Sequence, residues 1–429
     1  MGSGRKKIYV PFDILGYING AHPLVDGFTQ IVNPNFEFTR FKTFANREWK
    51  AVSSEVKSFS DQLGVICLKE SLDHSTAWRV VNDFILTRRP EIEMSIPLDA
   101  DFVFHHTVPY SLNCKNYILH VESISQLFFP YLLQGTPPVG SLKRNVAYHF
   151  LKHMLEAPSC LQVFTNMQFT VDQFRNVFQS KIIDQKVRLC KPSGRLEADT
   201  ISEILKKRRG REKKELNILF TNSYHDDPLS FYLRGGFDIL LCVLQISQHQ
   251  NNVNLTIRSS VPPEIRNSAL WDAIVACKHI RWIDSHITET ELIDLYSLSD
   301  VFYLHSNALH SLSILRGMSM GLTCIVSDVL GVSEYIQHNF NGIQLNGRKN
   351  AVNREDHATG WIYDDYREVL SQRLSPSVNF EEQKTLIMQL AEGKDMLDFI
   401  SKNAIKTAAD CFSEEASNAS FIKMIDEIT

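Results

Sequence analysis

Two arginines in the second half of the chain are placed to bind an anion. Arg234 is followed by two glycines, and Arg258 is followed by two serines. The guanidinium group offers a fixed fork of donors that suits phosphate oxygens and that lysine cannot reproduce. Gly235 would let the backbone approach a ligand closely. These residues predict a diphosphate site that could stabilise a departing diphosphate when a glycosyl–phosphate bond breaks, although a surface or interdomain ion pair explains either arginine as well.

A third polar segment, residues 305–311, adds to this prediction. It reads His-Ser-Asn-Ala-Leu-His-Ser and follows an apolar run. A helix that begins near Ser311 would present free backbone N–H groups and a partial positive charge, which favour an anion. In open α/β sheets, ligands bind outside the carboxyl ends of the strands. We therefore expect these segments to line one cleft, which would be a nucleotide-sugar site without a P-loop.

The elements that must position these residues alternate between short apolar runs and amphipathic stretches, which is typical of βαβ units and an α/β fold. The first half predicts strands at Lys7–Pro11, Leu63–Leu68, Phe102–His105, Tyr117–Val121 and Leu161–Thr165. The second half predicts strands at Leu216–Thr221, Val253–Arg258, His279–Trp282, Val301–His305 and Cys324–Ser327. Thr288 and Glu291 predict a capping box at a helix start, and residues 400–428 predict a final helix.

Length and composition limit the class of protein. A chain of 429 residues exceeds what one core supports, so we expect two domains with a boundary near 195–214. The division is residues 1–200, residues 201–400 and a C-terminal helix, 401–429, that packs back toward the first domain. The net charge of −4 argues against nucleic acid as a partner. The eight cysteines are scattered and predict reduced thiols.

Residues 300–342 resemble the donor-binding segment of family 4 glycosyltransferases. The likeness runs from Asp-Val-Phe-Tyr-Leu-His-Ser through Ser-Ile-Leu-Arg-Gly-Met-Ser-Met-Gly-Leu-Thr-Cys-Ile-Val-Ser-Asp to Gly-Val-Ser-Glu and Asn-Gly-Ile. Arg234 and Gly235 lie where the family carries a phosphate-binding basic residue before glycine. The resemblance implies a GT-B fold, in which two Rossmann-like domains face each other across a cleft. It also implies retention of anomeric configuration.

The chain departs from the family at two positions. The family's paired glutamates, eight positions apart, fall on Ala308 and Arg316. In the family these acids hold the donor sugar and the ribose. We therefore expect Arg316 to reach the ribose or a phosphate, with His310 or Ser313 holding sugar hydroxyls. The alternative is an arginine paired with an acid across the domain cleft.

The resemblance also nominates residues outside the arginine segments. His120 matches a strand-end histidine that faces the donor sugar, and it is the predicted catalytic residue, with Glu122 beside it. His105 and His106 are second candidates. Glu334 matches an acid that lies close to the nucleotide, although a helix-start glutamate explains it equally.

Glycines after the first strand and a possible metal motif carry weaker signals. Gly16 and Gly20 match the N-domain loop near the diphosphate and acceptor, but they lack the G-x-G-x-x-G fingerprint. Asp99-Ala-Asp101 resembles a metal-binding D-x-D motif, yet it precedes a strand in the other domain, and we interpret it as chance. We expect no metal and no cofactor, because arginines and a helix dipole can replace a cation.

The sequence thus predicts a metal-independent hexosyltransferase that moves a sugar from a nucleotide-sugar to a glycan or lipid-linked glycan, in bacterial surface polysaccharide synthesis. The chain shows no signal-like or membrane-spanning segment, which predicts a cytoplasmic location. Its basic run at residues 206–214 leaves open a peripheral contact with the inner face of the membrane. A nucleotide-sugar 2-epimerase and a non-catalytic sugar-binding scaffold stay open as alternatives.

Overall fold

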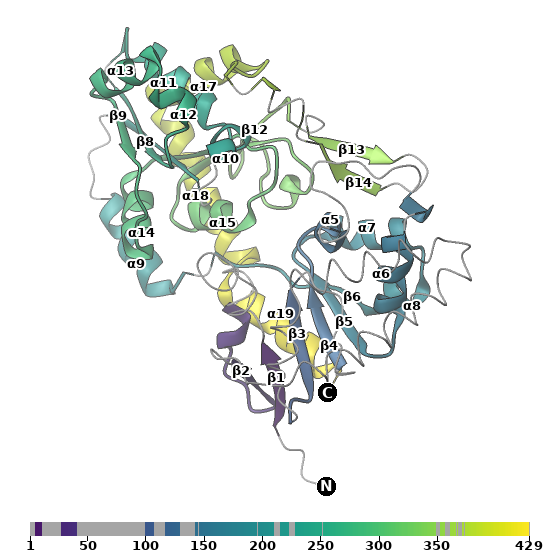
Figure 1. The fold of residues 1–429 in the computed structure, drawn as a ribbon. Coiled ribbons are helices and arrows are strands. Elements are labelled where there is room, and N and C mark those ends of the chain that lie inside the picture. The colour runs from purple at the N-terminus through teal and green to yellow at the C-terminus, as the bar shows by residue number, and fades with distance from the viewer. Residues whose placement is uncertain are drawn as a thin grey trace. The chain divides into compact units, whose positions relative to one another are not determined.

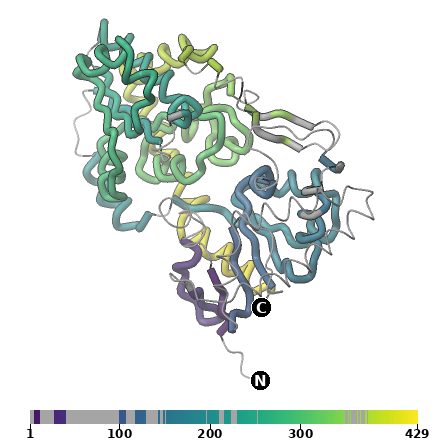
Figure 2. Tube along the Cα trace, in the orientation of Figure 1, coloured from purple at the N-terminus to yellow at the C-terminus, as the bar shows by residue number. Residues whose placement is uncertain are grey.

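The structure is a computed structural model, and it describes most of the second half of the chain and parts of the first. The described residues are 5–10, 27–40, 99–106, 116–128, 142–144, 146–194, 196–209, 215–222, 228–250, 252–348, 352–356, 361–365, 367, 371–372 and 374–428. They are drawn as a coloured tube in Figure 2. The predicted strand Leu63–Leu68 and the glycines Gly16 and Gly20 lie outside these ranges.

The chain forms two compact units. Unit 1 contains residues 1–191, 354–365 and 415–429, and unit 2 contains residues 192–353 and 366–414. The division falls at residue 192, near the predicted boundary region, and the chain passes from one unit to the other four times. The last segment, residues 415–429, belongs to unit 1.

Unit 1 is built on a parallel sheet with the order β2-β1-β3-β4-β5-β6. The strands are β1 (Lys6–Val10), β2 (Phe36–Arg40), β3 (Phe102–His106), β4 (Asn116–His120), β5 (Cys160–Thr165) and β6 (Val187–Leu189). Its helices are α5 (Ile124–Phe128), α6 (Val146–Glu156), α7 (Gln168–Phe178), α8 (Lys181–Lys186) and α19 (Glu414–Asp426). Phe421 of α19 stacks on Phe28 at 4.6 Å, so a helix from the end of the chain completes this core (Figure 1).

Unit 2 is built on a second parallel sheet with the order β12-β11-β10-β7-β8-β9. The strands are β7 (Leu216–Thr221), β8 (Val253–Arg258), β9 (Ile280–Ile283), β10 (Val301–Leu304), β11 (Thr323–Ser327) and β12 (Ile343–Leu345). Successive residues of β7, such as Ile218 and Leu219, are both buried, because helices cover both faces of the sheet. Counted from β7, this strand order is the Rossmann order 3-2-1-4-5-6.

The helices of unit 2 are α9 (Ala198–Arg209), α10 (Pro228–Leu233), α11 (Gly236–Ile246), α12 (Pro263–Arg266), α13 (Ala269–Ala276), α14 (Glu289–Leu298), α15 (Ser311–Ser319), α17 (Phe380–Glu392) and α18 (Lys394–Cys411). Most of these helices lie between the strands of unit 2, while α9 precedes β7 and α17 and α18 come after the last strand. The capping box predicted at Thr288 is confirmed: Glu291 N–H donates to Thr288 Oγ1 and Thr288 N–H donates to Glu291 Oε2. Two reciprocal bonds satisfy donors that a helix start otherwise leaves open.

Several sequence predictions are corrected at the level of single elements. The predicted last helix, residues 400–428, is two helices, because α18 ends at Cys411 and α19 begins at Glu414. Residues 206–209 of the basic run are the last turn of α9. There the guanidinium of Arg208 donates to the carbonyls of Ser299 and Gly321, so at least this arginine holds unit 2 together. A two-stranded ribbon, β13 (Asn353–Asp356) and β14 (Trp361–Asp364), was not predicted.

Candidate functional site

The switch point of the unit 2 sheet is where the geometry favours a ligand. Strands β7 and β10 are neighbours although β8 and β9 lie between them in sequence. The chain therefore leaves the carboxyl ends of β7 and β10 toward opposite faces of the sheet, which opens a crevice in folds of this kind. Asn222 follows β7 and His305 follows β10. The polar segments predicted from the sequence thus meet at one edge.

Hydrogen bonds fix the loops at this edge. Arg258 Nη1 donates to the carbonyl of Asn222 at 2.6 Å. Asn222 accepts from Ser230 Oγ at 2.8 Å and donates to Ser259 Oγ at 3.3 Å. Arg258 is the last residue of β8 and only 8% exposed, and its hydrogen bond to Asn222 holds the guanidinium at the end of β7. The residue lies at the predicted edge, and its role toward a ligand stays a prediction.

The Arg234–Gly235 segment leads into α11. Gly235 has φ 81° and is the N-cap of this 11-residue helix. A Cβ at this position would lie 2.6 Å from the carbonyl oxygen of His305, so only glycine lets α10 and α11 approach the end of β10 this closely. Arg234 itself is 5% exposed. The N-terminus of α11 therefore lies beside the loop that follows β10.

The N-terminus of α15 is the second helix start at this edge. His310 is its N-cap and forms a hydrogen bond through Nε2 with Ser306 Oγ at 3.0 Å, instead of capping the helix. Ser311 is 1% exposed, and its hydroxyl has no hydrogen-bond partner among the described residues. A buried hydroxyl without a partner costs free energy that a ligand oxygen could recover.

The remaining predicted residues of unit 2 have other partners. Arg316 donates from Nε to the carbonyl of Gly194 at 3.1 Å and pairs through Nη2 with Glu289 at 2.6 Å. Ser313 is half-buried. Ser313 forms a hydrogen bond with the buried Tyr296. Burial raises the pKa of Tyr296, and the Arg316 charge and the hydrogen bonds with Thr221 and Ser313 lower it in part. Arg316 is thus paired with an acid, but Glu289 belongs to the same unit and not to the other side of a domain cleft as the alternative had it.

Glu334 is the last predicted residue in unit 2. It lies in a 3-10 turn, η4 (Val332–Glu334), and its side chain is half-buried. Gly331 precedes this turn with φ 81°, a conformation that favours glycine. The contact of Glu334 with a nucleotide stays a prediction.

The predicted histidines of unit 1 lie at the carboxyl ends of β3 and β4. His120 and His106 are neighbours in register, and their Nδ1 atoms are 2.9 Å apart with the rings stacked. His105 points to the other side, with its ring edge-on to Tyr117 at 5.7 Å. The backbone N–H of Glu122 donates to Gln126 at 3.2 Å, and its carbonyl accepts from Thr170 at 2.9 Å. The structure thus joins His120 to His106 as a pair.

The D-x-D segment has a structural role. Lys7 Nζ pairs with Asp99 at 2.5 Å, and the backbone N–H of Lys7 donates to Asp101 at 2.8 Å. Both acids therefore fasten the start of β1. Among the described residues, no group of three histidine, cysteine or acidic side chains is placed to hold a metal ion.

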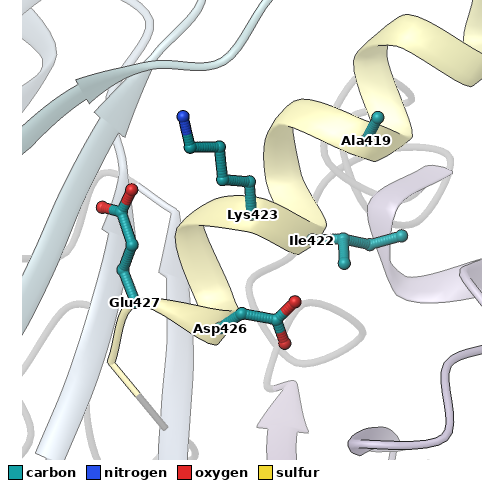
Figure 3. Close-up of a pocket in the computed structure, with 5 residues that line it drawn as sticks. All are labelled: Ala419, Ile422, Lys423, Asp426 and Glu427. Carbon is teal, nitrogen blue, oxygen red and sulfur yellow. The ribbon is translucent and has the colours of Figure 1, made fainter.

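A shallow groove of about 470 Å³ runs along α19 in unit 1 (Figure 3). It is lined by Ala419, Ile422, Lys423, Asp426 and Glu427. Asp426 accepts from Asn35, just before β2, at 3.2 Å, and Glu427 pairs with Arg188 of β6 at 3.3 Å, so both acids already have partners. None of the predicted site residues lines this groove.

In the part of the chain that the structure describes, no helix is long and apolar enough to cross a bilayer.

Sequence reasoning missed two charged residues at the unit 2 edge. Asp238 lies in the first turn of α11 and is 3% exposed, and Arg348 follows β12. Arg348 Nη2 donates to Asp238 Oδ2 at 3.1 Å. An acid in a first helical turn has an ordinary explanation, and the two residues are 110 positions apart in sequence, so no local signal could pair them.

Comparison with known proteins agrees with this geometry. Residues 230–358 match the family model described as glycosyl transferases group 1. No curated protein sequence matches the chain. Among the solved structures that resemble it, three do so over nearly its whole length, and at identities of 11–12% this likeness concerns the fold alone.

The three structures come from different bacteria. HepE from Anabaena, solved with UDP and glucose, has a TM-score of 0.54 and 11% identity, covering 99% of this chain and 100% of its own. Sucrose-phosphate synthase from Thermosynechococcus elongatus has a TM-score of 0.54 and 12% identity, covering 99% of each chain. A glycosyltransferase from Rickettsia africae has a TM-score of 0.51 and 12% identity, covering 99% of each. The fold is α/β of the GT-B type, and together with the family match it supports a glycosyltransferase.

Proposed function

We propose that this chain transfers a sugar from a nucleotide-sugar donor that binds at the switch point of unit 2. The observation that carries the proposal is the convergence of two helix N-termini, α11 and α15, at one sheet edge. Gly235 keeps backbone close to this edge, and Ser311 supplies a buried hydroxyl without a partner among the described residues. Backbone N–H groups at helix starts stabilise phosphate oxygens without a metal.

The donor is proposed to be a nucleoside diphosphate sugar with uridine as the first base to test. HepE, which shares the fold, was solved with UDP and with UDP-glucose. Arg234 and Arg258 are proposed to bind the diphosphate as it leaves. His310, Ser313 and Arg316 are proposed to contact the sugar or ribose, and Glu334 the nucleotide.

The acceptor is proposed to bind unit 1, where His120 and Glu122 would act on its hydroxyl or on the donor sugar. We propose a glycan or lipid-linked glycan acceptor, a bacterial surface polysaccharide pathway and retention of anomeric configuration. These proposals rest on the resemblance to family 4. Closure around the substrates would exclude water, which protects the activated sugar from hydrolysis.

The test is thermal unfolding with a panel of UDP-, GDP-, dTDP- and CMP-sugars. A ligand that binds only the folded state raises its stability by about 2.7 kcal/mol at a hundredfold excess over Kd. We expect one nucleotide to raise the Tm selectively, and Arg234→Ala to abolish the shift. Arg281→Ala removes an exposed arginine from the same unit and should leave the shift intact. If no nucleotide raises the Tm of the wild-type protein, the proposal is wrong.

A second candidate function is nucleotide-sugar binding without turnover. Arg316 and Ala308 replace two acids of the family pattern, and Arg316 is already paired with Glu289. Turnover assays separate the candidates. Release of nucleoside diphosphate only with an acceptor supports the transferase. Binding without turnover supports the second candidate, and an isomerised sugar formed without any acceptor supports an epimerase.

A further inference from the structure

A buried cluster of titratable and charged side chains lies at the same sheet edge as the proposed donor site and has no assigned role. Its members are Asp238 in α11, Arg348 after β12 and His305 after β10. Asp238 is 3% exposed and His305 is fully buried. The side chain of Arg348 is 12% exposed. A cluster of this kind is costly to bury unless its charges compensate each other, so its composition calls for an explanation.

Arg348 connects the two helix starts of the proposed site. Its Nη2 donates to Asp238 in the first turn of α11 at 3.1 Å, and its Nη1 donates to Asn307 Oδ1 at 3.1 Å. Asn307 lies in the loop that leads from β10 to α15. The backbone N–H of Arg348 donates to Asp328 at 2.8 Å, which fixes the arginine to the end of β11. One side chain thus contacts the first turn of α11 and the loop that precedes α15.

The protonation states of the cluster follow from its contacts. Burial alone would raise the pKa of Asp238, but the contact with His305, the charge of Arg348 and the N–H of Ser377 lower it below its ordinary value. Burial lowers the pKa of His305, and the Arg348 charge acts in the same direction, although Asp238 opposes both. At neutral pH the cluster therefore holds one carboxylate, one guanidinium and a neutral imidazole, with no net charge.

The position of Asp238 makes this balance matter for an anionic ligand. Its carboxylate lies three residues after Gly235, in the same helical turn that would present N–H groups to a diphosphate. An uncompensated carboxylate there would repel the ligand and offset the partial positive charge of the helix start, in surroundings where charges interact more strongly than in water.

We infer that Arg348 is a positioning residue for the donor: it neutralises Asp238 and holds Asn307, so that the starts of α11 and α15 accept a diphosphate together. This inference rests on the proposed function. It assigns Arg348 no contact with the ligand. The ligand class is a nucleoside diphosphate, whose charge distinguishes it from the bare nucleoside.

The experiment compares Arg348→Gln, Asp238→Asn and the double variant by titration calorimetry with UDP and with uridine. GDP and guanosine replace them if the panel above selects GDP. Arg348→Gln leaves the carboxylate uncompensated, and we expect it to weaken UDP binding on the order of tenfold or more. Uridine binding should change little. The double variant restores a neutral cluster and should recover most of the UDP affinity.

Controls separate charge from folding. Arg281→Gln removes an exposed arginine of the same unit and should leave both affinities unchanged. Asp238→Asn alone should bind UDP at least as tightly as the wild type, which tests the inference even if Arg348→Gln fails to fold.

Three results would overturn the inference while the proposed function stands. They are equal losses of UDP and uridine binding in Arg348→Gln, equal losses of UDP binding in the single and double variants, and weaker UDP binding by Asp238→Asn. If the wild-type protein binds no nucleoside diphosphate, the proposed function and this inference are both wrong.

Discussion

The two sheets end in different chemistry at their carboxyl edges. In unit 1, β3 and β4 end in the paired imidazoles of His106 and His120. In unit 2, β7 and β10 lead to Asn222 and to the start of α15, with Arg258 donating to the carbonyl of Asn222. Imidazoles exchange protons near neutral pH, while guanidinium groups and helix starts hold anions. The same sheet architecture thus ends in imidazoles in unit 1 and in guanidinium groups and helix starts in unit 2.

The histidine pair of unit 1 has a constrained protonation pattern. Two Nδ1 atoms at 2.9 Å can share one proton, so one ring donates and the other accepts. Both rings cannot carry a proton at Nδ1 together, and at most one can be cationic. The tautomer of His120 therefore depends on the tautomer of His106. The described strand ends of unit 2 contain no such histidine pair.

The sharpest test of this division is His120→Ala. We expect the rate of sugar transfer to fall by roughly 10²–10⁴-fold, because a positioned acid or base commonly contributes that much. Nucleotide affinity should stay within about twofold, since the proposed anion site lies in unit 2. Steady-state kinetics and calorimetry with UDP measure the two quantities. His153→Ala, at an exposed histidine of α6, is the matched control. Loss of nucleotide binding in His120→Ala would contradict the division.

A glycine pair tests the close approach in unit 2. Gly235 and Gly347 both have positive φ, but a Cβ at Gly235 would lie 2.6 Å from backbone, while one at Gly347 would lie 3.7 Å from its nearest neighbour. Gly347→Ala should cost about 1–2 kcal/mol from backbone conformation alone. Gly235→Ala should cost more, about 3–4 kcal/mol, because backbone must shift. Urea unfolding measures both, and equal losses would show that the contact with His305 relaxes freely.

The buried cluster predicts that unit 2 is acid-sensitive. Burial lowers the folded-state pKa of His305 below its ordinary 6.5, so the unfolded chain takes up this proton at a higher pH than the folded chain does. The stability that the neutral His305 imidazole contributes is therefore fully present above pH 6.5, and it is lost as the pH falls toward the folded-state pKa. We expect a lower Tm at pH 5.5 than at pH 7.5 and a shallower slope in His305→Asn. His286→Asn, at an exposed histidine, should keep the wild-type slope.

The smallest expected effect concerns helix capping. In unit 2, α14 begins with the Thr288 capping box, while in unit 1, α7 begins after Met167 without a side-chain cap. Thr288→Ala should lower the free energy of unfolding by about 1 kcal/mol, because the Glu291 N–H loses the Thr288 hydroxyl as its acceptor and the capping box is broken. Thr290→Ala, at an exposed position of the same helix, should cost less. Equal losses in urea unfolding would show that the box adds nothing beyond helix propensity.

The strands of unit 2 could be predicted closely from sequence. Leu216–Thr221 and Val253–Arg258 match β7 and β8 residue for residue, since β7 is a mostly apolar run and β8 alternates apolar and polar residues, both signals of a strand. The weaker elements escaped prediction. β6 and β12 have three residues each, too few for a periodic signal, while β2, Phe-Glu-Phe-Thr-Arg, has the alternation typical of a strand and was missed despite it. The break between α18 and α19 also carries no proline or glycine to mark it.

The sequence by itself determined which residue types end each strand, because hydrophobic patterning and turn chemistry are local. It therefore predicted the edge that carries Arg234, Arg258 and His310. Only the tertiary structure decided which residues meet across that edge. The Asp238–Arg348 pair, the His106–His120 pair and the Arg316–Glu289 pair each join separate elements. Strand order and helix packing bring such residues together, and no local pattern encodes these distances.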